Sequence, residues 1–185
     1  MIEVEVKLPI NNCEYVIETL NNRCYTKCGR LREEDVYFNG PDRDYRKTDE
    51  ALRLRKQDIL EGDNVGSATY ITYKGKKLDK VSMARKELET VIGDFEVMRE
   101  ILISLGYKPV TPVIKIREVY SKDYLTVCVD NVEGLGYYIE LEVCVEDESG
   151  REQALELIKN ELEMLGYSMQ DTTRVSYLSM LESKL

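Results

Sequence analysis

The sequence contains no histidine, and this absence narrows the chemistry that the chain can perform. Histidine is the commonest general base in enzymes, and it completes the usual serine or cysteine triad and the mixed zinc sites. The five cysteines are odd in number and include no Cys-x-x-Cys pair, so we expect reduced, mainly structural thiols rather than disulfides or zinc. Any catalysis therefore depends on carboxylates, lysines, arginines, tyrosines or a bound metal ion.

Long apolar runs and linker-like segments are also missing. No stretch approaches the roughly 18 apolar residues of a membrane span, and none has the pattern of a signal peptide. No segment rich in proline, glycine or serine interrupts the 185 residues, so we expect a single domain, 1–185. The net charge of −9 repels nucleic acid and anionic membranes on average. We therefore expect a cytoplasmic protein that binds neither, and a polyanionic ligand would need a local cluster of basic side chains.

What the chain does contain is hydrophobic periodicity of both kinds. Strand patterns occupy residues 2–8, 32–38, 51–57, 68–75, 83–91, 113–120, 124–132 and 137–145. Helical patterns occupy residues 12–22 and 94–105, a segment that ends at 165, and about 174–183. Eight strands with a few covering helices predict an α+β fold dominated by an antiparallel sheet. A sheet of that many strands can close on itself.

Two details of the helices are also predicted. In residues 94–105, the apolar positions form one stripe that we expect to be buried; they are Phe95, Met98, Ile101, Leu102 and Leu105. Ser149 and Glu152 have the spacing of a capping box, which predicts the start of the helix that ends at 165.

Most of the strands have one apolar face and one charged face. At the amino terminus, Glu3, Glu5 and Lys7 alternate with apolar residues, and alternate side chains of a strand share a face. The same pattern gives Arg53 with Arg55, Lys115 with Arg117, Glu140 with Glu142, and further charged residues at Lys74, Arg85 and Asp130. Like charges two residues apart lie roughly 6.6 to 6.8 Å from one another and repel. Such pairs are costly unless an opposite charge lies between them.

Three arrangements of the strands would offset the repulsion within these like-charged pairs. The charged faces could be solvated and joined by cross-strand salt bridges, or they could form a salt-bridged barrel interior without further function. Alternatively, the sheet is a barrel whose charged face lines a water-filled tunnel. In that tunnel the acids Glu3, Glu5, Asp130, Glu140 and Glu142 would hold one or two hard divalent cations, Mg²⁺ or Mn²⁺. The basic residues would hold a chain of phosphates, because guanidinium groups bind phosphate oxygens in pairs.

The ordered series of these motifs resembles the CYTH superfamily, also called the triphosphate tunnel metalloenzymes. It begins with Glu3-x-Glu5-x-Lys7 and continues through Arg53-x-Arg55, Lys74 in TYKG, Arg85 to Glu89, Lys115-x-Arg117, Asp130 and Glu140-x-Glu142. The segments DVYFNGPDRDYRKTDEALRLRK, ITYKGKK and VDNVEGLGYYIELE resemble the class IV adenylyl cyclase branch. Lys76 departs from that branch, which often has proline there, and TKCGRLREED stands in place of an aromatic and histidine-containing stretch.

The resemblance implies an eight-stranded tunnel barrel with flanking helices. It also implies a divalent metal on Glu3, Glu5, Asp130, Glu140 and Glu142, with Glu3, Glu5 and Glu142 as catalytic residues. The triphosphate would be bound by Lys7, Arg53, Arg55, Lys74, Arg85, Lys115 and Arg117. The implied reaction is the conversion of ATP to cyclic AMP and pyrophosphate; the alternatives are hydrolysis of tripolyphosphate, thiamine triphosphate or a nucleotide, or binding without catalysis. A homodimer is common in the cyclase branch.

Overall fold

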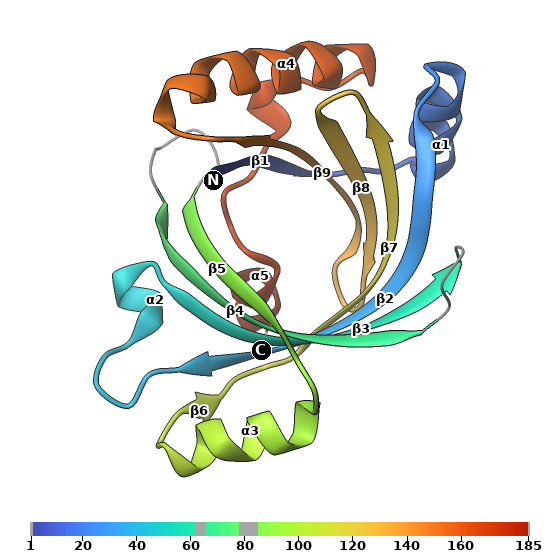
Figure 1. Cartoon of the computed structure of the whole chain (residues 1–185). Coiled ribbons are helices and arrows are strands. Elements are labelled where there is room, and N and C mark those ends of the chain that lie inside the picture. The colour runs from blue at the N-terminus through green and yellow to red at the C-terminus, as the bar shows by residue number, and fades with distance from the viewer. Residues whose placement is uncertain (1, 62–65, 78–84, 185) are drawn as a thin grey trace.

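The strands form one antiparallel sheet that closes into a barrel (Figure 1). The structure is a computed structural model that describes residues 2–61, 66–77 and 85–184. Its strands are β1 (Ile2–Pro9), β2 (Thr26–Asn39), β3 (Ala51–Glu61), β4 (Ser67–Lys77), β5 (Arg85–Ile92), β6 (Lys108–Pro109), β7 (Val113–Lys122), β8 (Leu125–Val132) and β9 (Gly136–Val145). The order β3-β4-β5-β1-β9-β8-β7-β2 is completed by pairing of β2 with β3, while the short β6 extends the edge beside β2. The predicted eight-stranded closed barrel is therefore confirmed.

Within the described residues, five helices lie around the barrel. They are α1 (Cys13–Asn22), α2 (Tyr45–Thr48), α3 (Phe95–Ser104), α4 (Arg151–Met164) and α5 (Tyr177–Glu182), with short 3₁₀ turns η1 (Glu148–Gly150) and η2 (Met169–Asp171). In the view of Figure 1, α4 covers one side of the barrel, α3 lies at the opposite side, and α5 is seen through the barrel opening. None of the helices in the described ranges combines the length and the apolar character needed to cross a membrane.

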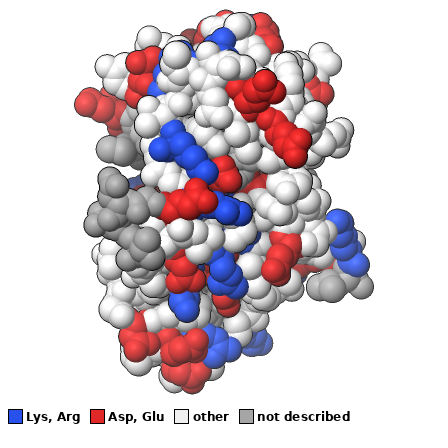
Figure 2. Space-filling view, turned by 90° about the vertical axis from the view of Figure 1, so that its right-hand side faces the viewer, with Lys and Arg blue, Asp and Glu red and all other residues white. Residues whose placement is uncertain are grey.

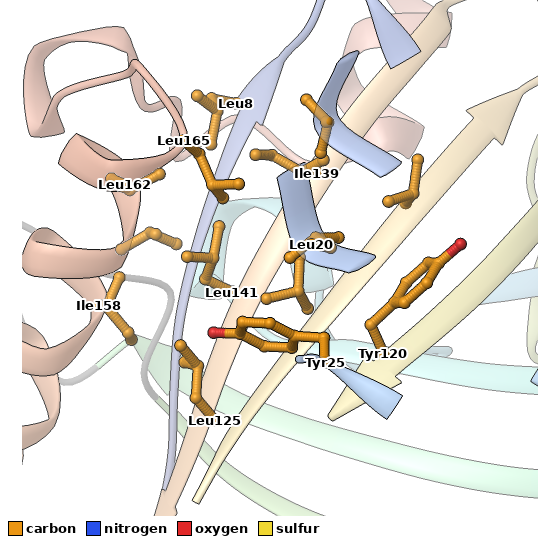
Figure 3. Packing of buried hydrophobic residues seen from close by; sticks show 14 of the residues in the cluster. Leu8, Leu20, Tyr25, Tyr120, Leu125, Ile139, Leu141, Ile158, Leu162 and Leu165 are labelled. Carbon is orange, nitrogen blue, oxygen red and sulfur yellow. The ribbon is translucent and has the colours of Figure 1, made fainter. Parts of the chain in front are cut away.

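The main hydrophobic core lies outside the barrel, between its wall and two helices. Side chains of β1 and β9 that point away from the barrel interior pack against α1 and α4, as the labelled residues Leu8, Ile139, Leu141, Ile158 and Leu162 show (Figure 3). Each of these five is fully buried. Because strand side chains alternate, burial of these residues on the outer face directs the charged residues of β1 and β9 into the barrel.

A second, smaller cluster packs α3 against the opposite wall of the barrel. Leu102 of α3 is buried with Phe38, Leu52 and Leu54 of β2 and β3. The predicted stripe is only partly correct, since Ile101 and Leu105 are 45% and 63% exposed. A ten-residue helix lying on a convex barrel contacts it along a narrow line, so the flanking apolar positions remain exposed.

The predicted capping box before α4 is wrong. Gly150 is the N-cap of α4 and makes no side-chain capping bond, while Asp147 caps the preceding turn η1 by accepting a hydrogen bond from the backbone N–H of Ser149. A capping box does occur in η2, where Ser168 and Asp171 satisfy each other's backbone N–H groups.

The predicted strand at 83–91 begins outside the described residues, and its described part lies within β5.

Candidate active site

The charged faces of the strands line a cavity of about 650 Å³ inside the barrel. Every residue predicted for the site lines this cavity except Asp130, which lies behind the lining and is completely buried. On the one face that Figure 2 shows, acidic and basic side chains are interspersed among uncharged ones. The cavity itself provides the local concentration of basic groups that a polyanion requires.

Three lining acids form a carboxylate cluster, which we define as Glu3, Glu5 and Glu142. Glu5 of β1 lies directly opposite Glu142 of β9 in the strand register, so two like charges face each other across a strand pair, an arrangement that is normally destabilising. Within the described residues, neither Glu3 nor Glu5 forms an ion pair or hydrogen bond, and Glu142 accepts only a weak contact from the Cys144 thiol. Among the described residues the cluster therefore has no direct ion-pair partner, although Lys74, Lys7 and Arg117 lie near enough to act on its charges.

Burial and mutual repulsion raise the pKa values of the cluster more than the basic neighbours lower them. Burial, followed by the repulsion of Glu142, raises the pKa of Glu3 to about 9. The pKa of Glu5 is raised by burial and by Glu140, and that of Glu142 by burial and by Glu5. Carboxylates that share a site and cannot all ionise are the expected result of like charges placed together.

A hard divalent cation would fit this donor set. Carboxylate oxygens are the ligands that Mg²⁺ and Mn²⁺ prefer, and a dication would remove the repulsion that raises these pKa values. In the described ranges, no three Cys, Asp or Glu side chains already stand in ligating geometry. The side chains of the carboxylate cluster would therefore have to turn toward one another to bind a metal.

Metal binding to this cluster is expected to strengthen as the pH rises. Glu3, whose pKa is about 9, must lose its proton before it can bind a cation, so binding releases a proton near neutral pH. The apparent affinity for Mn²⁺ should increase between pH 6 and pH 9, by up to about tenfold per pH unit for each proton released. Calorimetric titration in two buffers of different ionisation enthalpy measures the protons released. A pH-independent affinity would contradict this expectation, and Glu3→Gln should reduce the slope.

Across the cavity lies a basic cluster, which we define as Lys7, Arg53, Arg55, Lys115 and Arg117. These side chains come from β1, β3 and β7, and all line the cavity. Unlike the carboxylate cluster, the basic cluster forms direct ion pairs with neighbouring acids. Lys7 is the least constrained member: its Nζ atom lies 4.0 Å from Glu140, and burial lowers its pKa against the opposing effect of Glu140.

Arg55 and Arg53 are held by acids of β2. Arg55 donates to both carboxylate oxygens of Asp35 at 2.6 and 2.8 Å and to Glu33 at 2.9 Å. Arg53 lies 3.5 Å from Asp35 and donates to the Thr72 hydroxyl at 3.2 Å. Burial alone would raise the pKa of Asp35, but Arg55 and Arg53 lower it. The two guanidinium groups are thus fixed before any ligand arrives.

Asp130 performs the same task for Arg117 and Lys115. Arg117 donates to both Asp130 oxygens at 2.7 and 2.6 Å and also to Glu140. The Nζ atom of Lys115 lies 3.4 Å from Asp130 and 3.3 Å from Glu33. The oxygens of Asp130 already accept hydrogen bonds from these basic groups, and in the structure the carboxylate orients Arg117. The role of Asp130 as a metal ligand stays a prediction.

The two remaining predicted phosphate contacts lie nearer the carboxylate cluster. Lys74 pairs with Glu87 at 2.5 Å, and Arg85 is the strand partner of Glu3 at the seam between β5 and β1.

Glu140 differs from the three acids of the carboxylate cluster. Burial tends to raise its pKa, but three basic neighbours, of which Arg117 has the largest effect, lower the pKa below its ordinary value. Glu140 therefore belongs electrostatically to the basic cluster and not to the carboxylate cluster.

Several residues of the site were missed at the sequence level. Glu33 and Asp35 of β2 have the same two-residue spacing as the predicted pairs, so the alternation rule could have found them. Glu87 and Glu89 of β5 belong to the predicted Arg85 to Glu89 motif, but neither was given a role in the site. No such signal marks Tyr177, which belongs to α5 and reaches the cavity from the end of the chain.

Known proteins resemble this chain over nearly its whole length. The family model described as "CYTH domain" matches residues 1–177. A Methanocaldococcus jannaschii protein named "Putative adenylate cyclase" is 42% identical over 180 residues, which are 97% of this chain and 98% of that protein. A solved structure from Pyrococcus horikoshii has a TM-score of 0.89 and 36% identity, with 99% of each chain covered. A Hippeastrum protein described as having a dominant triphosphatase activity has a TM-score of 0.67 and 18% identity, with 99% of this chain and 95% of that chain covered.

Proposed function

The chain belongs to the CYTH domain family, whose tunnel enzymes are metal-dependent and bind triphosphates, and on that premise we propose that it converts ATP to cyclic AMP and pyrophosphate. The observation that carries the proposal is that one cavity holds both a carboxylate cluster without direct ion pairs among the described residues and a basic cluster of fixed geometry. Pure anion binding would gain nothing from the three unpaired acids. Their presence favours a metal-dependent reaction over simple binding.

The residues of the basic cluster would bind and orient the triphosphate. Arg55 and Arg117 each offer a planar donor group that is already held in place, so little conformational entropy is lost when phosphate oxygens bind. A Mg²⁺ or Mn²⁺ ion on the carboxylate cluster would neutralise negative charge and polarise the phosphoryl oxygens when bound. The electrostatic environment is thus complementary to the charge that builds up on the phosphates as the leaving group departs.

In the cyclase reaction, the ribose 3′ oxygen forms a bond to the α-phosphorus as the bond from that phosphorus to pyrophosphate breaks. The 3′ hydroxyl must lose its proton in this step, and no histidine exists to accept it. The lining carboxylates Glu3, Glu5 and Glu142 have raised pKa values. A carboxylate accepts a proton only in its ionised form, so the acceptor would be a member of this cluster that has already lost its own proton. We assign the proton acceptor to this cluster.

A second candidate function is hydrolysis of a triphosphate by an attacking water molecule. The composition of the lining favours it, because Tyr37 and Tyr177 are the aromatic residues among the described lining residues, which are otherwise mostly ionisable. Such a surface recognises phosphates well and offers little to stack on an adenine ring. The Hippeastrum protein of the same fold is described as having a dominant triphosphatase activity, and one fold can host both reactions.

Product analysis separates these functions. The purified chain is incubated with Mg²⁺ or Mn²⁺ and either ATP or inorganic tripolyphosphate, and the products are identified by phosphorus NMR and anion-exchange chromatography. Cyclic AMP with pyrophosphate in equal amounts is the expected result. Orthophosphate, with ADP or pyrophosphate as the other product, would replace the cyclase assignment by the hydrolase. If neither substrate reacts while tripolyphosphate binds, the chain is a binding module.

A further inference from the structure

The basic cluster is contacted by an aromatic residue that does not belong to the barrel wall. Tyr177 is the first residue of α5, is 7% exposed, and lines the cavity together with the other residues of its segment. The segment before α5 is attached to β1, because the backbone N–H of Thr173 donates to the carbonyl oxygen of Lys7 at 2.7 Å. The end of the described chain is therefore fixed beside Lys7.

The ring of Tyr177 lies close to two lysines of the basic cluster. The Nζ atom of Lys7 is 4.2 Å from the ring centroid, and that of Lys115 is 5.3 Å away. Both distances fall within the range of cation–π attraction. Tyr138 packs edge-on against the same ring, with centroids 5.2 Å apart, so the orientation of the ring is itself fixed.

The hydroxyl group of Tyr177 contacts an acid that holds the basic cluster in place. It donates a hydrogen bond of 3.0 Å to the Oδ2 atom of Asp130, the carboxylate that orients Arg117 and Lys115. Burial, followed by Glu140 and Asp130, raises the pKa of Tyr177 well above its ordinary value. The hydroxyl therefore stays protonated and remains a donor over the whole working pH range.

We propose that Tyr177 is a positioning residue for triphosphate binding: its ring holds the ammonium groups of Lys7 and Lys115, and its hydroxyl holds Asp130. The inference rests on the proposed function, since the lysines are positioned for a triphosphate. Lys7 needs such a support most, because a lysine side chain is flexible and the ion pair with Glu140 spans 4.0 Å. Without the ring, Lys7 would sample several rotamers. Phosphate binding would then have to fix one of them, and the conformational entropy lost in this step would weaken the binding.

The kinetic test uses three variants and inorganic tripolyphosphate with Mg²⁺. Tyr177→Leu removes both the ring and the hydroxyl, and it should raise KM about 10-fold to 30-fold with a smaller change in kcat. Tyr177→Phe keeps the ring and should raise KM only about threefold. The matched control is Leu181→Ala, which loosens the packing of α5 from a partly buried position that does not line the cavity. A KM for Tyr177→Leu equal to that of Leu181→Ala would overturn the proposal.

A second measurement needs no substrate and separates the proposal from the proposed function. Protons held over the face of an aromatic ring resonate upfield, so the side-chain methylene protons nearest Nζ of Lys7 should show an upfield shift in wild type and in Tyr177→Phe, and lose it in Tyr177→Leu. An unshifted Lys7 in wild type would overturn the proposal. If wild type neither binds nor hydrolyses tripolyphosphate, the proposed function fails even when the shift is present. If wild type turns over normally and Tyr177→Leu does too, only the role of Tyr177 fails.

Discussion

Replacing Glu5 with glutamine is expected to lower turnover by at least about 100-fold, equivalent to about 2.7 kcal/mol of transition-state stabilisation. The same change should stabilise the metal-free protein at pH 8, because it removes one of two carboxylates that face each other across β1 and β9. The folded-state pKa of Glu5 is raised, so wild type loses stability as the pH rises above the unfolded value of about 4.3. We expect the melting temperature of Glu5→Gln to exceed that of wild type by about 2 to 4 °C at pH 8, and to equal it near pH 4.

The matched control for this experiment is Glu140→Gln, on the same wall of the cavity. Glu140 accepts from Arg117 and lies near Lys7, and these basic neighbours lower its pKa. Loss of its charge should therefore destabilise the metal-free protein, which is the opposite effect. Melting curves of both variants, recorded with a chelator, test this difference in sign. If both variants are destabilised equally, the carboxylate cluster is not under repulsion.

Replacing Arg117 with alanine is expected to have the second largest effect. Arg117 is the donor that links Asp130, Glu140 and the cavity, so its loss should weaken binding of tripolyphosphate by about 100-fold. It also leaves Asp130 completely buried with fewer donors. Breaking a buried pair typically costs about 3–5 kcal/mol, and we expect the lower end because Lys115 and Tyr177 still contact Asp130. Calorimetric titration measures the binding, at a temperature where the circular dichroism spectrum shows that the variant is folded.

Two further variants test the interpretation of that result. Arg117→Lys keeps the charge but loses the planar fork, so its affinity should be intermediate. Arg30→Ala removes an arginine of β2 that pairs with Glu61 and Glu118 and does not line the cavity. This variant should change the affinity for tripolyphosphate by less than twofold and the free energy of unfolding by about 0.5 kcal/mol or less. Equal losses in Arg117→Ala and Arg30→Ala would contradict a triphosphate site inside the barrel.

The strands were predictable from the sequence because alternation of apolar and charged residues is a local property. Each predicted strand lies within or overlaps a strand of the described barrel. The errors have local causes as well. β2 begins at Thr26, six residues before its predicted start, where a register shift between Lys27 and Gly29 interrupts the alternation. The helix α2 has four residues, too few for a helical period, and depends on capping by Asp44.

The division of the site into two clusters was not predictable, because it depends on which strands become neighbours. Glu140 and Glu142 have identical sequence contexts as members of one Glu-x-Glu pair. In the barrel, Glu142 faces Glu5 while Glu140 faces Lys7, and their pKa values shift in opposite directions. Similarly, Asp130 was identified as an interior acid, but its role toward Arg117 follows from the register of β7 against β8. Tyr177 reaches the cavity by tertiary packing alone.

The central proposal is that the carboxylate cluster would hold a divalent cation and the basic cluster a triphosphate, both inside the barrel. The most direct measurement is a crystal structure of the chain with Mn²⁺ and tripolyphosphate, in which anomalous scattering locates the manganese. We predict manganese at about 2.1 to 2.2 Å from oxygens of Glu5 or Glu142 and from a phosphate oxygen, with the same triphosphate contacting Arg117. Manganese bound only on the outer surface, or a triphosphate outside the barrel, would contradict the account.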